Sequence, residues 1–181
     1  MRAFFAIDLP EELKNKITAI IKLLQQKNPS KYISWTSPKN LHITLKFLGD
    51  VSNTQCEKFL PEIMDVVSQQ PKFTLRLEKI DLFPAKRKSR VISWLPSPMG
   101  RLVALAHQIE QQVVLYDVPA ETRPFKPHLT LARIKKPIKD ELQIIDVPQL
   151  AFELEKLTLF RSETTHAGSQ YEVVSELPLK A

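Results

Sequence analysis

The chain has 181 residues, of which 43% are apolar, and its formal net charge is +6. The apolar content supports a packed core and excludes a disordered chain, and the length fits one domain or one domain built from two small lobes. The moderate excess of basic residues suits an anionic partner such as RNA, although ordinary surface lysines account for it equally well.

Three further features of the sequence exclude other classes of protein. A single cysteine, Cys56, rules out an intramolecular disulfide and a multi-thiolate metal site, and we expect a buried structural thiol there. Only three glycines leave no room for a glycine-rich phosphate loop. The apolar run before Asp8 is too short for a signal peptide, and no segment approaches the roughly 18 apolar residues of a membrane span. We therefore expect a cytoplasmic protein.

The first half of the chain reads as alternating strands and helices. Residues 2–9 predict a strand, and Pro10 begins a helix that runs to about Lys27. A turn then leads into an apolar strand over residues 41–48. Thr54 and Glu57 have the spacing of a capping box, which predicts the start of a second helix there. Its expected apolar face consists of Phe59, Leu60, Ile63, Met64 and Val67. A strand over about 73–83 follows.

The second half begins with a basic loop, Lys86–Arg90, and a strand over 91–95. Helical spacing of apolar residues predicts a third helix over about 100–115. Three prolines then interrupt the approach to another apolar strand. The remaining elements are a polar, irregular stretch over 135–149 and two strands over about 152–161 and 170–177.

The two apolar strands that follow these turns carry the same short motif, His-x-Thr. It occurs as His42-Ile43-Thr44 and again as His128-Leu129-Thr130. Because side chains alternate along a strand, the histidine and the threonine of each copy point to the same face, and the apolar residue between them points to the core.

The spacing of the motifs indicates an internal repeat. Leu9-Pro10 returns 86 residues later as Leu95-Pro96, and His42 returns at the same offset as His128. The segment 77–83 is echoed 77 residues later by 154–160. Three matches in the same order predict two related lobes, roughly 1–85 and 86–181, of a single domain. Lobes packed about a pseudo-twofold axis would bring His42 and His128 to one cleft.

Two histidines and two threonines around one cleft suit the hydrolysis of a cyclic phosphodiester. One imidazole can act as base and the other as acid, and the motif does not assign the two roles. Thr44 and Thr130 can donate hydrogen bonds to phosphate oxygens, and Arg133 can add a charged contact. A zinc site is not expected because a third ligand is missing. His107 and His166 lack the motif, and we expect neither to take part.

These segments resemble the paired motifs of the 2H phosphoesterase superfamily. The first copy is Asn40-Leu41-His42-Ile43-Thr44-Leu45-Lys46-Phe47-Leu48-Gly49, and the second is Pro127-His128-Leu129-Thr130-Leu131-Ala132-Arg133. The opening Arg2-Ala3-Phe4-Phe5-Ala6-Ile7-Asp8-Leu9-Pro10 and Trp35 are similar to those of the RNA 2′,3′-cyclic phosphodiesterases first named 2′-5′ RNA ligases. The resemblance covers essentially the whole chain.

The resemblance implies a bilobal α+β fold with a pseudo-twofold axis, in which two antiparallel sheets line a central cleft and helices lie outside. It implies conversion of RNA 2′,3′-cyclic phosphate ends to 2′-phosphomonoesters by a monomer without metal or other cofactor. In the family pattern His42 is the proton donor and His128 the proton acceptor. Other activities remain open: 2′-5′ RNA ligation, hydrolysis of small cyclic nucleotides or 2′-5′ oligonucleotides, or binding of RNA or nucleotides without catalysis.

Further contacts to RNA are expected around this centre. Phe125 and Phe47 are candidate stacking surfaces for the terminal base, and core packing is the alternative that the sequence favours for Phe47. Arg123 and the Lys86–Arg90 cluster are candidate contacts for upstream phosphates, with a solvated loop as the alternative for the cluster.

Overall fold

A computed structural model describes residues 1–83, 91–136, 142–165 and 168–180. The Lys86–Arg90 cluster, His166 and part of the 135–149 stretch therefore lie outside the described residues. The elements in chain order are β1 Arg2–Asp8, α1 Glu11–Lys27, β2 Ile33–Trp35, the 3-10 turn η1 Pro38–Asn40, β3 His42–Asp50, α2 Asn53–Ser68, β4 Phe73–Phe83, β5 Val91–Ser97, α3 Met99–Val114, β6 Leu129–Ile134, β7 Leu150–Leu154, β8 Lys156–Thr165 and β9 Gly168–Pro178.

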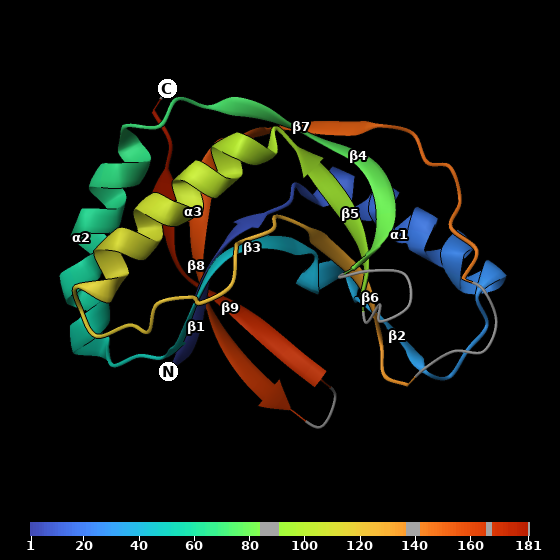
Figure 1. Cartoon of the computed structure of the whole chain (residues 1–181), viewed down its shortest axis with the longest axis horizontal. Coiled ribbons are helices and arrows are strands. Elements are labelled where there is room, and N and C mark those ends of the chain that lie inside the picture. The colour runs from blue at the N-terminus through green and yellow to red at the C-terminus, as the bar shows by residue number, and fades with distance from the viewer. Residues whose placement is uncertain (84–90, 137–141, 166–167, 181) are drawn as a thin grey trace.

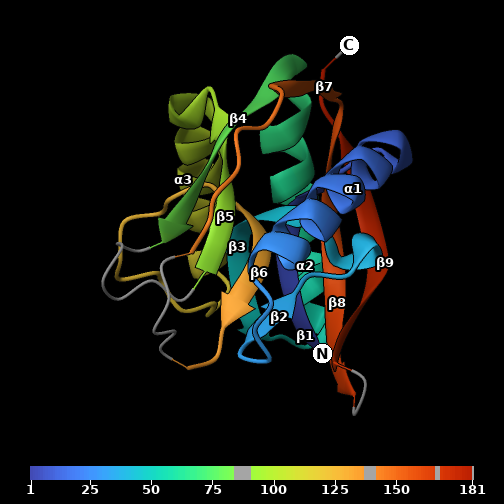
Figure 2. The ribbon, with the colours of Figure 1, turned by 90° about the vertical axis from the view of Figure 1, so that its right-hand side faces the viewer.

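The strands form one antiparallel sheet whose order is β7-β4-β5-β6-β3-β1-β8-β9, with β2 added to β6. The α+β class with a duplicated architecture is confirmed. The two expected sheets are continuous with each other, because β3 and β6 pair at one position, Ile43 opposite Leu129. On either side of this pair the sheet curls away as two halves (Figures 1 and 2).

The two half-sheets exchange strands between the repeats. The order is palindromic: β3, β1 and β8 on one side of the junction correspond to β6, β5 and β4 on the other. β4 comes from the first half of the chain but pairs with β5, and β8 comes from the second half but pairs with β1. Each half-sheet therefore contains strands from both sequence repeats. Neither repeat could form its half-sheet without a strand from the other repeat.

The helices are divided unequally between the two sides of the molecule. In Figure 1, α2 and α3 lie together at the left and α1 lies at the right, behind β4 and β5. Among its described residues the second repeat has no counterpart of α2, and the irregular residues 142–149 lie at the corresponding place in the chain. Leu142, Ile145 and Val147 of this segment pack against the core, as a helix would. No helix in the described part of the chain is long and apolar enough to span a membrane.

Two boundaries differ from the sequence-based prediction. The capping box of α2 is formed by Ser52 and Gln55, two residues earlier than predicted, because the hydroxyl of Ser52 accepts from the Gln55 backbone N–H at 3.1 Å. The predicted strand over 152–161 is two strands: β7 pairs with β4, and β8 pairs with β1 at the other side of the sheet. The alternation shifts by one residue at the break: Phe152 and Leu154 point inward before it and Leu157 and Leu159 after it, with Glu155 and Lys156 both exposed between them. The two runs are close enough to be read as one strand, and side-chain period alone does not show that the partner strand changes.

Apolar side chains form one main core and a small second cluster. Helix α1 contributes Leu13, Ile17, Ile20, Ile21 and Leu24 to the main core, as its spacing predicts. Cys56 is buried, also as predicted, and burial raises the pKa of its thiol. Met64, predicted to face the core, is instead 45% exposed. The second cluster is formed by Phe4, Ala6 and Phe160, with Tyr171 against it.

A buried asparagine joins the end of α1 to the segment that replaces the missing helix. The side chain of Asn28 donates to the Leu24 carbonyl at 2.9 Å and to the Gln143 carbonyl at 2.9 Å. Its oxygen accepts from the Gln143 backbone N–H at 2.8 Å. Asn28 is only 7% exposed. If its side chain were removed, the backbone groups of Leu24 and Gln143 that bond to it could not all form hydrogen bonds with water instead.

We predict that Asn28→Ala lowers the free energy of unfolding by about 2–4 kcal/mol, because three hydrogen bonds of one buried side chain are lost together. Denaturant unfolding at neutral pH measures this loss. The control is Asn53→Ala, which changes an exposed asparagine at the start of α2 and should cost much less. Equal losses in the two variants would contradict this account of Asn28.

Candidate active site

The His-x-Thr motifs meet where the two half-sheets join. His42 is the first residue of β3, and His128 immediately precedes β6. Because Ile43 lies opposite Leu129 in an antiparallel pair, continuing the register by one residue each way sets His42 across from Thr130 and Thr44 across from His128. Ile43 and Leu129 are fully buried on the other face. The register therefore places all four polar side chains on one face of the sheet.

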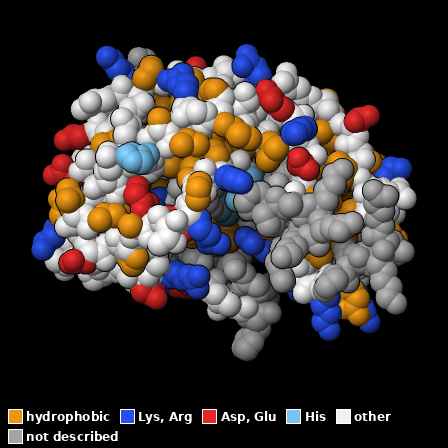
Figure 3. Space-filling model, viewed as in Figure 1, with side chains coloured by type: hydrophobic (Ala, Val, Ile, Leu, Met, Phe, Trp, Pro, Cys, Tyr) orange, Lys and Arg blue, Asp and Glu red, His pale blue; other side chains and the backbone are white. Residues whose placement is uncertain are grey.

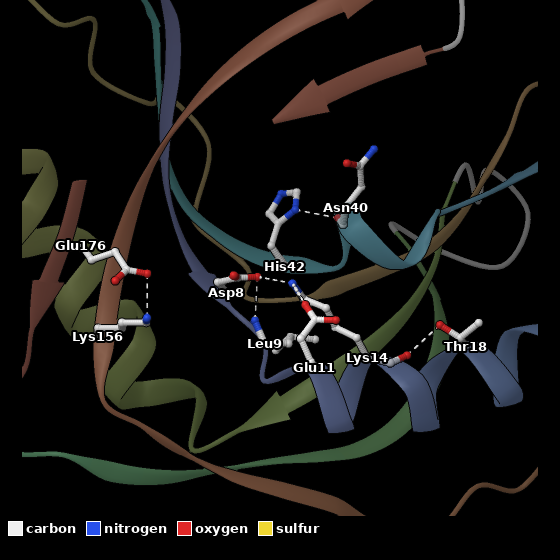
Figure 4. Close-up of polar contacts among 9 residues, drawn as sticks. All are labelled: Asp8, Leu9, Glu11, Lys14, Thr18, Asn40, His42, Lys156 and Glu176. Atoms are coloured by element: carbon white, nitrogen blue, oxygen red, sulfur yellow. Dashed lines mark hydrogen bonds and ion pairs between the residues drawn. The ribbon is translucent and has the colours of Figure 1, made fainter. Parts of the chain in front are cut away.

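Both imidazoles are held by the same backbone contact. Nδ1 of His42 lies 2.8 Å from the carbonyl of Asn40 (Figure 4), and Nδ1 of His128 lies 2.8 Å from the carbonyl of Lys126. A carbonyl oxygen only accepts, so Nδ1–H donates in each ring and Nε2 is the nitrogen that gains or loses a proton. Nε2 of His42 lies 3.0 Å from Oγ1 of Thr44, whose hydroxyl can donate to it.

A β-bulge in each motif strand determines which later residues face the cleft. The β1–β3 register shifts next to Leu45, and the β5–β6 register shifts next to Leu131, 86 residues later. A bulge adds one residue and reverses the alternation beyond it. Phe47 and Arg133 are therefore exposed and line the cleft. Core packing, which strict alternation favours for Phe47, is wrong: its side chain is 61% exposed.

The same bulge turns Lys46 inward, and this buried charge fixes the chain leading to the second motif. Lys46 is 5% exposed. Its Nζ lies 2.7 Å from a carboxylate oxygen of Glu110 on α3 and donates to the Pro119 carbonyl at 2.8 Å. The Glu110 carboxylate also accepts from the backbone N–H of Glu121 at 2.6 Å. The buried Lys46 and the partly buried Glu110 each make a further hydrogen bond to this segment, so the ion pair connects the chain before His128 to β3 and α3.

Aromatic side chains surround His42 on the cleft side. Its ring lies 5.0 Å from that of Phe4 and 5.2 Å from that of Tyr171, edge to face. Burial lowers the pKa of His42 to about 4, and nearby Arg133 and His128 act in the same direction. The Asn40 carbonyl and Asp8 oppose this shift but do not outweigh it. With this pKa, His42 is neutral near pH 7.

Asp8, across from His42 on β1, belongs to a charged cluster beneath the site (Figure 4). Its carboxylate lies 2.9 Å from Nζ of Lys14 and accepts from the Leu9 backbone N–H at 2.9 Å. Lys14 also contacts Glu11 at 3.1 Å. Burial lowers the pKa of Lys14, but its two carboxylate partners outweigh that effect and leave the pKa raised. Lys14 therefore offsets much of the negative charge that Asp8 presents to His42.

These elements enclose a cleft of about 830 Å³. Figure 3 shows histidine side chains recessed near the centre of the molecule, with Lys and Arg side chains close by. All five predicted centre residues line it: His42, Thr44, His128, Thr130 and Arg133. The described lining also includes Arg2 and Lys39 but no Asp or Glu, which favours an anionic ligand. The described residues include no group of His, Cys, Asp and Glu that could hold a metal ion.

Other predicted site residues lie elsewhere. Phe125 packs against the main core, and the exposed side chain of Arg123 contacts Glu121 at 3.5 Å. Neither is among the described residues that line the cleft. His107 is exposed on α3 and is likewise absent from this lining.

The β8–β9 hairpin supplies a wall of the cleft that sequence reasoning missed. Its lining residues are Ser162, Thr164, Gly168, Ser169, Gln170 and Tyr171. Nδ2 of Asn40 donates to the Ser169 carbonyl at 2.8 Å and so connects this hairpin to the turn that holds His42. These residues belong to no repeated motif, and alternation along a hairpin does not say what its polar face covers.

Comparison with known proteins gives one consistent family. The profile described as "LigT like Phosphoesterase" matches twice, over residues 7–93 and 94–171. The RNA 2′,3′-cyclic phosphodiesterase of Methanocaldococcus jannaschii is 35% identical, over 97% of this chain and 99% of that protein. The protein of the same name from Escherichia coli is 32% identical, over 94% of this chain and 92% of its own.

Solved structures agree with the sequence matches. The protein TT0787 of Thermus thermophilus superposes with a TM-score of 0.81 at 28% identity, covering 99% of this chain and 98% of that one. E. coli LigT in complex with 3′-AMP superposes with a TM-score of 0.78 at 29% identity and the same coverage.

We predict that His42 makes the fold less stable in acid. Because the folded state holds the pKa of His42 at about 4, below its ordinary 6.5, the unfolded chain binds more protons as the pH falls below about 6.5. This contribution is complete above that pH and is lost as the pH falls through about 4. Between about pH 7 and pH 4.5 the loss is about 2 kcal/mol.

Denaturant unfolding of wild type and His42→Asn at these two pH values measures the effect. The Asn amide can still donate to the Asn40 carbonyl but does not titrate, so the variant should lose about 2 kcal/mol less. His107→Asn, which changes an exposed histidine, is the control and should follow wild type. An equal loss of stability between the two pH values in wild type and His42→Asn would refute the lowered pKa of His42.

Proposed function

The chain belongs to the LigT-like phosphoesterase family, and we propose that it hydrolyses the 2′,3′-cyclic phosphate ends of RNA to 2′-phosphomonoesters. The observation that carries this proposal is the opposition of two His-x-Thr motifs across the Ile43–Leu129 pair, in a cleft whose described lining is cationic. The names of the relatives from M. jannaschii and E. coli support the same reaction.

In the proposed mechanism, the two histidines act on opposite sides of phosphorus. Nε2 of His128 accepts a proton from water as the water oxygen bonds to phosphorus. The P–O3′ bond breaks, and Nε2 of His42 gives its proton to O3′, which leaves as the 3′-hydroxyl. Thr44 and Thr130 donate to the non-bridging oxygens, and Arg133 balances their charge. The product is a 2′-phosphate, and each histidine must then return to its starting protonation state.

The role of His42 as acid requires that substrate binding changes its protonation. Before substrate binds, burial holds its pKa at about 4. A bound phosphodiester is an anion in contact with the ring, and a neighbouring negative charge favours the protonated form. We propose that binding the phosphate raises the pKa of His42 and that the ring takes up a proton with the substrate. The Asp8 carboxylate, whose charge Lys14 offsets only in part, favours the same protonated form of His42.

We further propose that residues 1–181 form one functional domain acting as a monomer, because one chain supplies both motifs and every described wall of the cleft. The substrates we propose are RNA ends or small cyclic nucleotides. A reducing, cytoplasmic location fits the single buried cysteine. Ligation to a 2′-5′ linkage would use the same groups in the same direction, with the 5′-hydroxyl of a second RNA in place of water and O3′ again leaving.

We predict that His42→Ala or His128→Ala lowers kcat on a short RNA with a 2′,3′-cyclic end by about 10²- to 10⁴-fold, because each removes a proton-transfer group. Turnover of wild type should persist in chelator. His107→Ala, changed on an exposed face of α3, is the control and should keep wild-type turnover. Full activity in either cleft variant would refute the mechanism, and binding without turnover by wild type would favour the non-catalytic alternative.

A substrate with sulfur in place of O3′ assigns the two roles. A thiolate leaves without protonation, so a general acid is no longer needed, whereas a base is still needed to activate water. We predict that this substrate restores much of the turnover of His42→Ala and little of that of His128→Ala. The comparison is the ratio of rates on the sulfur and oxygen substrates for each variant. The opposite pattern would make His128 the acid.

A further inference from the structure

The end of the cleft beyond Thr44 carries a feature that hydrolysis of the cyclic phosphate does not use. The exposed Phe47 and, past it, Arg2 line this end. We propose that they bind the nucleotide that precedes the terminal one in RNA, with its base on Phe47 and its phosphate on Arg2. This inference rests on the proposed function and adds that the cleft recognises an oligonucleotide rather than a mononucleotide.

Phe47 is presented to the cleft as a supported platform. It occupies the position in the first motif that Arg133 occupies in the second, 86 residues later, and matching bulges turn both toward the cleft. Its ring is 61% exposed and leans on Phe4 at 5.8 Å, and Phe4 in turn lies 5.0 Å from His42. A flat apolar ring, fixed from below and open above, is the surface on which an unpaired base stacks.

Phe47 contributes little to the fold, which leaves binding as its role. A buried Phe stabilises a core, but one that is mostly exposed does so only weakly. Phe4 and Phe160 form the buried part of this cluster, at 2% and 7% exposure. Phe47 extends the cluster from His42 along the floor of the cleft, so a chain of nucleotides whose end reacts at His42 would pass over it.

The two arginines of the cleft lie far enough apart along the strands to contact two different phosphates. Arg133 follows Thr130 on β6, close to the histidine centre. Arg2 lies on β1 across from Asp50, the last residue of β3, and so at the end of that strand far from His42. Arg2 has no ion-pair partner among the described residues, and its backbone is fixed because the Met1 amino group donates to the Val51 carbonyl at 2.6 Å. A cyclic mononucleotide has only one phosphate, which the histidine centre takes. The volume of about 830 Å³ is also near the upper limit for a small-molecule pocket.

The test compares two substrates: a mononucleoside 2′,3′-cyclic phosphate and a trinucleotide with the same cyclic end. We expect Phe47→Ala to lower the ratio of kcat/KM for the trinucleotide to that for the mononucleotide by about 5- to 100-fold, the effect of losing one stacked base. Phe47→Leu should show most of this loss and Phe47→Trp little of it. An unchanged ratio for Phe47→Ala would overturn the proposal.

Arg2 is tested through salt dependence. A phosphate contact to single-stranded nucleic acid contributes about 0.7 to the slope of log affinity against log salt. Arg2→Gln should therefore lower the slope for the trinucleotide by about this amount relative to the slope for the mononucleotide. An unchanged difference between the two slopes would overturn the assignment of Arg2.

Two controls separate this inference from other outcomes. Leu115→Ala removes an apolar side chain that is 74% exposed outside the described cleft lining, and should leave the substrate ratio at the wild-type value. Trp35→Ala tests the other end of the cleft, and a length-dependent loss in this variant alone would overturn the assignment to Phe47. Binding of the corresponding 2′-phosphorylated mono- and trinucleotides repeats the comparison without turnover, so a failure of the proposed hydrolysis is recognised separately.

Discussion

The pairing of Ile43 with Leu129 is the contact on which the rest of the site depends. It is the single register position at which β3 and β6 join, and it makes one sheet of two halves. Both side chains are fully buried, so apolar burial holds the position that sets the polar residues on either side. If one of the two strands slipped by one residue, its histidine would turn toward the core and its apolar neighbour toward water. The register that stabilises the fold thus also assembles the site.

The exchange of β4 and β8 between the half-sheets ties the two motif strands to each other. Each repeat completes the sheet of the other, so the two motifs cannot separate without breaking pairs on both sides of the junction. The ion pair of the buried Lys46 with Glu110 adds a connection from the first motif strand to the helix and loop that precede the second. The proposed two-histidine mechanism needs such a fixed arrangement, because its acid and its base would act on opposite sides of one phosphorus atom.

The duplication leaves the two histidines chemically unequal. Both donate Nδ1–H to a carbonyl two residues earlier. His42 lies against Phe4 and Tyr171 and across from Asp8, whereas continuing the β5–β6 register places Leu95 across from His128. Burial lowers the pKa of His42 by more than the carboxylate raises it. An ancestral pair of equal sites can in this way acquire an acid and a base through their surroundings alone.

The sequence by itself determined most of the elements and the repeat, and it indicated the residues that we propose for the centre, because a two-residue period and an 86-residue offset can be read without knowing which strands pair. The tertiary structure alone decided the partners. It split the predicted strand over 152–161 between opposite sides of the sheet, reversed the faces of Lys46 and Phe47 through a bulge, and brought Tyr171 and Asn40 to the cleft. The physical reason is that strand pairing and bulges are set by residues far apart in the chain, and alternation is the same whichever partner a strand has.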